Sequence, residues 1–143
     1  MTLSQYVKKR NGVSIGAPGS MINMLKRSLG ASSFYLFWHY WNPIWGYYLS
    51  LKVMRPLNQF LPRSFAIVLT FTFSGAIHDL AISLIKWQVT YFMTVWFYIM
   101  GCIVLITIKF KISYQGLDGL IRAIINFALI AFSFVLSLVI SKY

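Results

Sequence analysis

Three long apolar runs constrain this chain more than any other feature of its sequence. They cover residues 65–85, 87–108 and 120–140, and each is close to the ~20 residues that a helix needs to cross the hydrocarbon core of a bilayer. Hydrophobic residues make up 59% of the 143 residues and charged residues 10%, whereas a soluble domain carries about 25% charged residues. We therefore predict an all-α membrane protein with about three transmembrane helices.

Two segments before the first run complete the predicted fold. Residues 1–30 are basic, and we expect a partly flexible cytoplasmic or interfacial segment in which 21–29 form an amphipathic stretch, with a solvated basic turn as the alternative. Residues 34–51 hold three Trp and four Tyr, which favour the membrane interface, and Pro43 disfavours helical geometry just before it. This aromatic segment is predicted to be a broken interfacial or re-entrant helix. Residues 31–143 then form a single membrane domain.

The connections between the runs differ in length. Only Lys86 separates the first run from the second, which predicts a tight antiparallel hairpin. Residues 109–119 form a polar loop that contains Gly116 and Gly119 and is long enough to reset the direction of the third helix.

Positive charges are distributed unevenly around the three runs. The chain has 13 Lys and Arg but only 2 Asp and Glu, which gives a net charge of +11. If the helices alternate across the membrane, all basic residues except Lys86 and Lys142 lie on the side of the N-terminus. Because cytoplasmic loops collect Lys and Arg, we expect a cytoplasmic N-terminus, a C-terminus on the opposite side, and contact with anionic headgroups. Basic residues that flank apolar runs do not form a nucleic-acid-binding face, so no nucleic-acid partner is predicted.

His78 and Asp79 lie inside the first apolar run, and an ionisable residue at membrane depth is by default a candidate functional residue. On a helix, Thr70, Ser74 and His78 share one face because they are four residues apart, whereas Asp79 points about 100° away. His78 lies roughly 20 Å from the start of the span and about 10 Å from its far end. A neutral imidazole can remove a proton from a hydroxyl as its oxygen attacks an acyl carbon. Packing between helices is the alternative role.

Metal ligands are scarce in this sequence. The histidines are His39 and His78, the acids are Asp79 and Asp118, and the single Cys102 has no partner. A protein-bound metal usually takes three or four such ligands from one cluster. We therefore predict neither a metal site nor a disulfide framework.

Several short elements between residues 34 and 85 occur in the order known from one enzyme family. They are Trp41-Asn42-Pro43, Tyr47-Tyr48, Arg55-Pro56-Leu57, Ala66, Thr70-Phe71, Ser74-Gly75 and His78-Asp79. This order resembles the signature half of the membrane-bound O-acyltransferases, in which a tryptophan-rich WN or WH segment leads through a basic-Pro-Leu element to a helix reading S-x-x-x-H-[E/D]. The resemblance covers residues 34–85, about a third of the chain.

The resemblance implies a role for each matching residue. His78 would be the general base and Asn42 its polar partner, with His39 a competing candidate for that upstream role. Ser74 and Asp79 would support the histidine. The implied reaction transfers an acyl group from acyl-CoA, as co-substrate, to a hydroxyl acceptor, and it needs no other cofactor.

Three basic residues are candidates for binding the phosphates of acyl-CoA at the cytoplasmic face, and they are Lys52, Arg55 and Arg63. Anchoring to headgroups is their alternative role. Members of the family have several hundred residues and enclose a tunnel for the acyl donor, whereas this chain has 143. A second hypothesis is therefore a non-catalytic accessory subunit or pseudo-enzyme that retains the motif. Both hypotheses predict a partner, either a second copy of the chain or another membrane subunit.

Overall fold

The computed structural model describes residues 1–143 as helices joined by loops, and it contains no strand. The elements are α1 (Leu3–Asn11), α2 (Ser20–Leu29), α3 (Phe34–Tyr40), α4 (Pro43–Leu49), the π-helix η1 (Ser50–Met54), α5 (Arg55–Phe60), α6 (Arg63–Lys86), α7 (Phe92–Lys109) and α8 (Gly119–Ile140). Three of them, α6, α7 and α8, are long and apolar enough to cross a membrane. The predicted all-α class with three candidate spans is confirmed.

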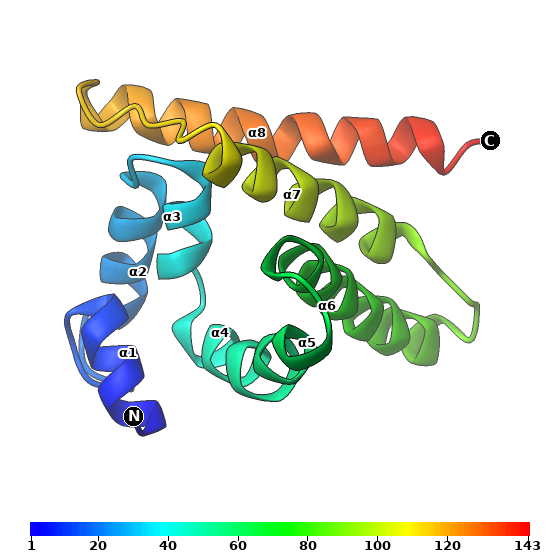
Figure 1. Ribbon diagram of the computed structural model, residues 1–143, viewed down its shortest axis with the longest axis horizontal. Coiled ribbons are helices and arrows are strands. Elements are labelled where there is room, and N and C mark those ends of the chain that lie inside the picture. Colours follow the sequence, from blue (N-terminus) through cyan, green and yellow to red (C-terminus); the bar gives the residue numbers. More distant parts are fainter.

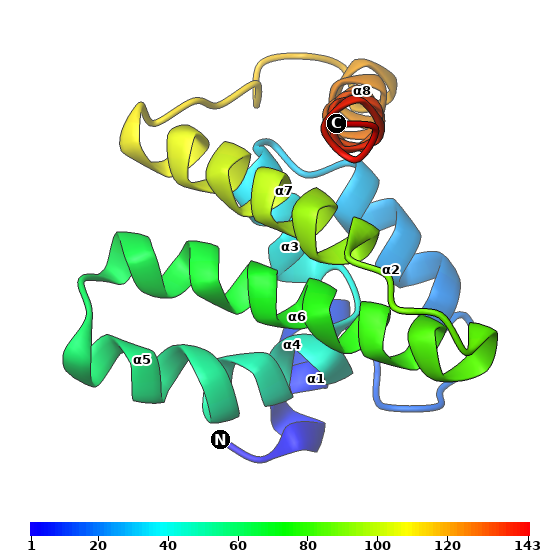
Figure 2. The ribbon, with the colours of Figure 1, turned by 90° about the vertical axis from the view of Figure 1, so that its right-hand side faces the viewer.

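The three long helices do not form a parallel bundle. Helices α6 and α7 run antiparallel and pack along most of their length, and α8 packs on α7 (Figure 1). In Figure 2, α8 is seen nearly end-on while α6 and α7 lie across the view. Helices α2 and α3 pack beside α8, α3 also contacts α7, and α4, η1 and α5 pass under α6. Helix α8 is therefore held to the hairpin directly by α7, and α2 and α3 add further contacts.

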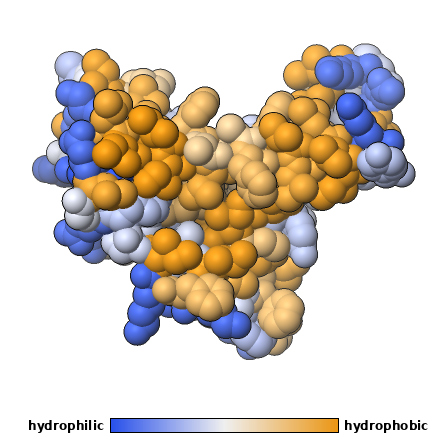
Figure 3. Space-filling view, turned by 90° about the horizontal axis from the view of Figure 1, so that it is seen from above, coloured by the Kyte–Doolittle hydropathy of each residue, from blue (hydrophilic) through white to orange (hydrophobic).

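Large apolar side chains cover the outside of the protein. Only 22 of the 143 residues are buried, while side chains such as Leu84, Phe127 and Val135 are more than half exposed. Apolar atoms cover much of the face in Figure 3, which is seen from above the view of Figure 1. A soluble monomer rarely exposes so much contiguous apolar surface. The long helices thus fit a multi-pass integral membrane protein.

The buried core joins the aromatic segment to the long helices. Phe34 and Phe37 of α3 pack with Ile67 of α6 and with Met100 and Val104 of α7. These five side chains are no more than 5% exposed. Their removal from water or lipid headgroups fixes α3 against the hairpin.

The aromatic segment is broken where the sequence predicts. Helix α3 ends at Tyr40, and Asn42 has a left-handed backbone with φ 40°, a conformation that Asn adopts more easily than most residues. The Asn42 Oδ1 accepts a hydrogen bond of 3.2 Å from the Trp45 amide and so caps α4. Pro43 follows as the first residue of α4, where its missing N–H costs nothing.

Two features of the fold differ from the sequence analysis. Residues 3–11 form helix α1, which begins with a capping box between Thr2 and Gln5, where we expected a partly flexible segment. The turn between the first two spans is also longer than expected, because α7 begins at Phe92 and residues 87–91 form a loop. The third predicted run agrees closely with α8, and the amphipathic stretch agrees with α2.

Gly75 allows α6 and α7 to approach each other closely. A Cβ added at Gly75 would lie 2.5 Å from the Met93 carbonyl oxygen and 2.8 Å from the Thr94 Cα. We expect Gly75→Ala to lower the free energy of unfolding by about 2 kcal/mol, since overpacking outweighs the higher helix propensity of Ala. Reversible unfolding in mixed micelles measures the change.

The matched control is another helical glycine, Gly46, where an added Cβ would meet only the Tyr6 hydroxyl, at 3.8 Å. Gly46→Ala is expected to leave the stability unchanged or raise it by up to about 1 kcal/mol. If both substitutions raised the stability, α6 and α7 would not be in contact at Gly75.

Candidate functional site

His78 lies on α6 with a fixed ring orientation. Its side chain is half-buried, and its Nδ1 lies 2.6 Å from the Ser74 carbonyl oxygen. A carbonyl oxygen can only accept a hydrogen bond, so Nδ1 carries a proton. In the neutral imidazole the lone pair is then on Nε2. In this tautomer, Nε2 can accept a proton.

Aromatic rings from two other elements surround this imidazole. Phe97 of α7 stacks on it with ring centroids 5.1 Å apart, and Trp45 of α4 meets it edge-on at 6.4 Å. The Trp45 indole Nε1 also donates a hydrogen bond of 2.9 Å to the Ser74 hydroxyl oxygen, and Ser74 is fully buried. Ser74 therefore serves the site twice, since its carbonyl orients His78 and its hydroxyl holds Trp45.

Of the three polar residues predicted to share one face of α6, only Ser74 and His78 belong to this site. The Thr70 hydroxyl donates to the Ala66 carbonyl of its own helix, 2.6 Å away. Ser74 and His78 are joined as described, whereas Thr70 makes no hydrogen bond to either. The site is thus built around the C-terminal half of α6.

Asn42 reaches the site only through the helix that it caps. Its side chain is exposed, and its Oδ1 is bound to the Trp45 amide. No hydrogen bond joins Asn42 to His78. Asn42 fixes the first turn of α4, and this turn presents the Trp45 ring to His78 and Ser74.

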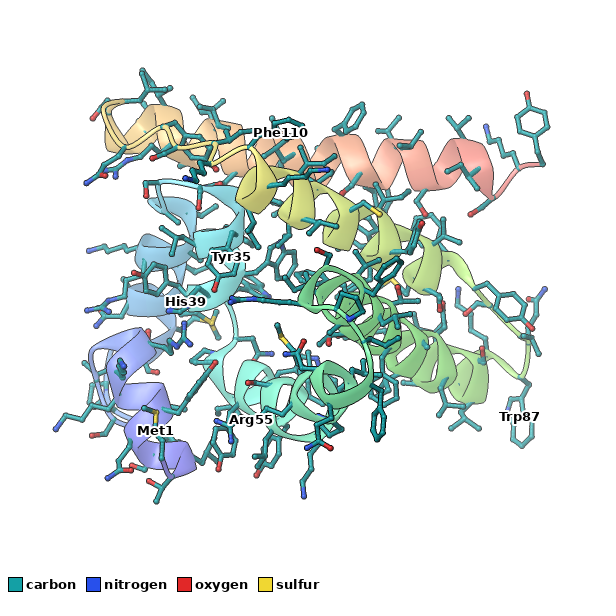
Figure 4. All side chains as sticks on the ribbon, viewed as in Figure 1. Met1, Tyr35, His39, Arg55, Trp87 and Phe110 are labelled. Carbon is teal, nitrogen blue, oxygen red and sulfur yellow. The ribbon has the colours of Figure 1, made fainter.

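His39 is not brought together with His78. It lies on α3, where its ring packs against Tyr35 at 6.1 Å and Tyr40 at 5.3 Å. Figure 4 labels His39 and Tyr35 on this helix. The nearest aromatic link from α3 to the site is Trp38, which packs on Phe97 at 6.2 Å and whose buried Nε1 has no hydrogen-bond partner.

Asp79 serves the start of α7 rather than the histidine. One carboxyl oxygen accepts hydrogen bonds from the Thr90 hydroxyl at 3.0 Å and the Met93 amide at 3.1 Å. The other accepts from the Thr94 amide at 2.7 Å and the Thr94 hydroxyl at 2.6 Å. The residue at the N-cap of α7, Tyr91, supplies no side-chain cap. Asp79 is therefore the cap of α7, supplied by α6, and its negative charge lies at the positive end of the helix dipole.

The three basic residues predicted to meet phosphates are all exposed and lie on different elements. Lys52 is on η1, Arg55 begins α5 and Arg63 begins α6. Of the three, only Arg55 lines the cavity between α1, α4 and η1. A second basic cavity contains Arg27 and Arg122, and neither cavity is lined by His78.

Sequence reasoning missed the aromatic residues of the site. The sequence places Trp45 in the aromatic segment expected at the membrane interface and gives no role to Phe97, because their contacts with His78 arise only in the folded chain. The partners of Asp79 left a weak signal, since Thr90 and Thr94 stand four residues apart where the second apolar run lacks a local cap. No three His, Cys, Asp or Glu side chains come close enough to hold a metal ion.

No family model matches the chain, and neither a curated protein nor a solved structure matches it.

Proposed function

We propose that this chain is a membrane-embedded O-acyltransferase-like protein, in which His78 is the general base and acyl-CoA, or a similar thioester, is the acyl donor. The observation that carries the proposal is the hydrogen bond between His78 Nδ1 and the Ser74 carbonyl oxygen, at 2.6 Å. It leaves Nε2 free to accept a proton at membrane depth. The order of the short sequence elements between residues 34 and 85 supports acyl transfer as the reaction class.

The proposed reaction moves one proton and exchanges one bond. The acceptor hydroxyl donates its proton to His78 Nε2 while its oxygen attacks the thioester carbon. The carbon–sulfur bond then breaks, and the imidazolium returns the proton to the leaving thiolate. The Ser74 carbonyl stabilises the imidazolium because Nδ1 donates to it throughout.

The other predicted residues take supporting roles in this proposal. Asn42 positions Trp45 through the cap of α4, and Ser74 orients both His78 and Trp45. Lys52, Arg55 and Arg63 remain candidates for contact with donor phosphates or anionic headgroups. We further propose that the N-terminus is cytoplasmic and that the C-terminus is on the opposite side, as the charge bias predicts.

The test compares the two histidines in the purified full-length chain. We expect His78→Gln to lower the rate of acyl transfer at least 100-fold, since general base catalysis contributes about 10² to 10⁴. His39→Gln makes the same chemical change on α3, and its rate is expected to stay within about twofold, because the ring of His39 packs against Tyr35 and Tyr40. The measurement is thiol release from acyl-CoA with glycerolipid, sterol, sugar or water as acceptor. Equal rates for wild type and His78→Gln would refute the catalytic role.

A non-catalytic accessory role is the second candidate function. It is favoured by the exposed apolar faces of the three long helices, of which α8 is the least covered, with 17% of its most apolar window buried. Such a face can contact lipid, another copy of the chain or a different membrane subunit. Inactivity of the wild type with every acceptor, together with stoichiometric co-purification of another membrane protein, would favour this role.

A further inference from the structure

A basic cavity lies between the first helix and the segment that leads into the membrane domain. Its volume is about 230 Å³, and its polar lining comprises Tyr6, Lys9, Arg10, Tyr47, Ser50 and Arg55. These residues come from α1, α4, η1 and the first residue of α5, and α1 packs directly on α4. Figure 4 labels Met1 and Arg55, which lie on the two sides of this region. Because a water molecule occupies about 30 Å³, the cavity can hold a phosphate group but not a whole lipid.

The three cations of the cavity have no counter-ion within the chain. The protein contains only two acids, Asp79 and Asp118. Asp79 caps α7, and Asp118 accepts a hydrogen bond from the Gly119 amide at the start of α8. Neither acid lines the cavity. Because like charges held together repel each other, an anionic ligand would stabilise Lys9, Arg10 and Arg55 in this arrangement.

Arg10 carries an unused hydrogen-bond donor in this region. Its guanidinium lies over the Tyr6 ring at 4.7 Å, which orients it, and its Nη1 is buried without a hydrogen-bond partner. Arg10 also lines the cavity, and the fork geometry of a guanidinium suits the oxygens of a phosphate or carboxylate.

The hydroxyls and the local backbone agree with this assignment. Tyr6 and Tyr47 pack edge to face at 5.4 Å on one side of the cavity. Ser50 is the first residue of the π-helix η1, and π-helical turns are often retained at functional sites. Ser50 and Arg55, which stand at the two ends of η1, both line the cavity.

We propose that this cavity binds a phosphate group, carried either by the headgroup of an anionic lipid such as a phosphatidic acid or by a soluble phosphate ester. Two guanidinium groups, a lysine and the Tyr6 and Ser50 hydroxyls line one small cavity and are donors that suit a doubly charged phosphate, whereas the Tyr47 hydroxyl already donates to the Met1 carbonyl oxygen. The proposal is independent of catalysis by His78, which does not line the cavity.

The test measures binding of dihexanoyl phosphatidic acid to the full chain in a neutral detergent, by calorimetry or native mass spectrometry. The double variant Arg10→Gln/Arg55→Gln removes two cavity charges. Lys26→Gln/Lys109→Gln removes two exposed charges outside the cavity. We expect the cavity variant to bind at least tenfold more weakly than wild type, and the control to bind within twofold. Arg55→Gln alone, at an exposed position, should weaken binding at least threefold without affecting folding.

Two further ligands identify the source of the phosphate. Dihexanoyl phosphatidylcholine, which lacks net charge, is expected to bind at least tenfold more weakly than phosphatidic acid. Displacement of phosphatidic acid by pyrophosphate would assign the cavity to soluble phosphates, and resistance to displacement would assign it to lipid. Equal weakening by the cavity and control variants, or equal binding of the two lipids, would overturn the proposal. Either result would show that the lipid binds through nonspecific attraction and not at the cavity.

Discussion

Asp79→Asn is expected to lower the free energy of unfolding by about 3 kcal/mol, because hydrogen bonds to a charged group contribute about 1.5 to 3 kcal/mol each and are replaced here by a neutral amide. The carboxyl oxygens of Asp79 accept from four donors, two on Thr94 and one each on Thr90 and Met93. An Asn amide offers one oxygen, and its NH₂ group would face N–H groups that also donate. The start of α7 would lose the partner that holds it against α6.

The matched control uses the other acid of the chain. Asp118 is exposed and accepts one hydrogen bond, of 2.8 Å, from the Gly119 amide. Asp118→Asn makes the same change in charge and shape, and it should alter the stability by less than about 0.5 kcal/mol. Unfolding in mixed micelles compares the two, and hydrogen exchange of residues 90–95 locates the effect. Equal stabilities for the two variants would show that Asp79 does not cap α7.

Much of the fold could be predicted because it follows from local composition and from the solvent. The three apolar runs are long enough to be spans wherever they pack, and they correspond to α6, α7 and α8. The break at Asn42 was predictable as well, since Pro43 restricts the residue before it whatever the surroundings are. These features depend on a few neighbouring residues or on no partner at all.

The length of the first hairpin loop could not be predicted in the same way. Hydropathy alone begins the second span at Trp87, but Trp87 is 94% exposed and the helix begins at Phe92. The start of α7 is determined by Asp79, which is separated from Thr94 by 15 residues. A cap supplied by another helix is a tertiary interaction, and the sequence pattern of α7 does not contain it.

The candidate site was predictable only in its central residue. An imidazole in an apolar run is visible in the sequence, and the expectation that Asp79 points away from it agrees with the contacts of Asp79 at α7. Trp45 and Phe97 lie 33 residues before and 19 residues after His78 in the printed numbering. Their rings reach His78 because α7 packs on α6 and Trp45 of α4 hydrogen-bonds to Ser74, and neither contact is visible in the periodicity of the sequence.

Polar residues on two faces of helix α6 thus have different partners. Ser74 and His78 face the aromatic rings of Trp45 and Phe97, while Asp79 faces the start of α7. The neighbouring carboxylate is already bound by its own donors, so it cannot pair with an imidazolium at His78. In the proposed reaction, His78 would therefore be oriented by the Ser74 carbonyl oxygen and not by a carboxylate.

Asn126→Leu is expected to lower the free energy of unfolding by about 3 kcal/mol, because each buried polar group left without a partner costs about 1 to 3 kcal/mol. The fully buried Asn126 donates from Nδ2 to the carbonyl oxygens of Leu29, at 2.9 Å, and Ala31, at 3.0 Å. Its Oδ1 accepts from the Tyr114 hydroxyl. One side chain of α8 therefore joins the turn before α3 to the loop before α8.

A variant of Tyr114 separates the contribution of the Tyr114–Asn126 hydrogen bond from those of the two bonds that Asn126 donates. Burial raises the pKa of Tyr114 to about 12, so its hydroxyl remains a donor at neutral pH, and the bond to Asn126 is lost only as the pH rises through that value. Tyr114→Phe removes this bond alone and should cost about 1 kcal/mol, less than Asn126→Leu. Asn58→Leu, the same substitution at an exposed position of α5, should change the stability by less than about 0.5 kcal/mol. If Asn126→Leu were no more destabilising than Asn58→Leu, Asn126 would not hold α8 to the short helices.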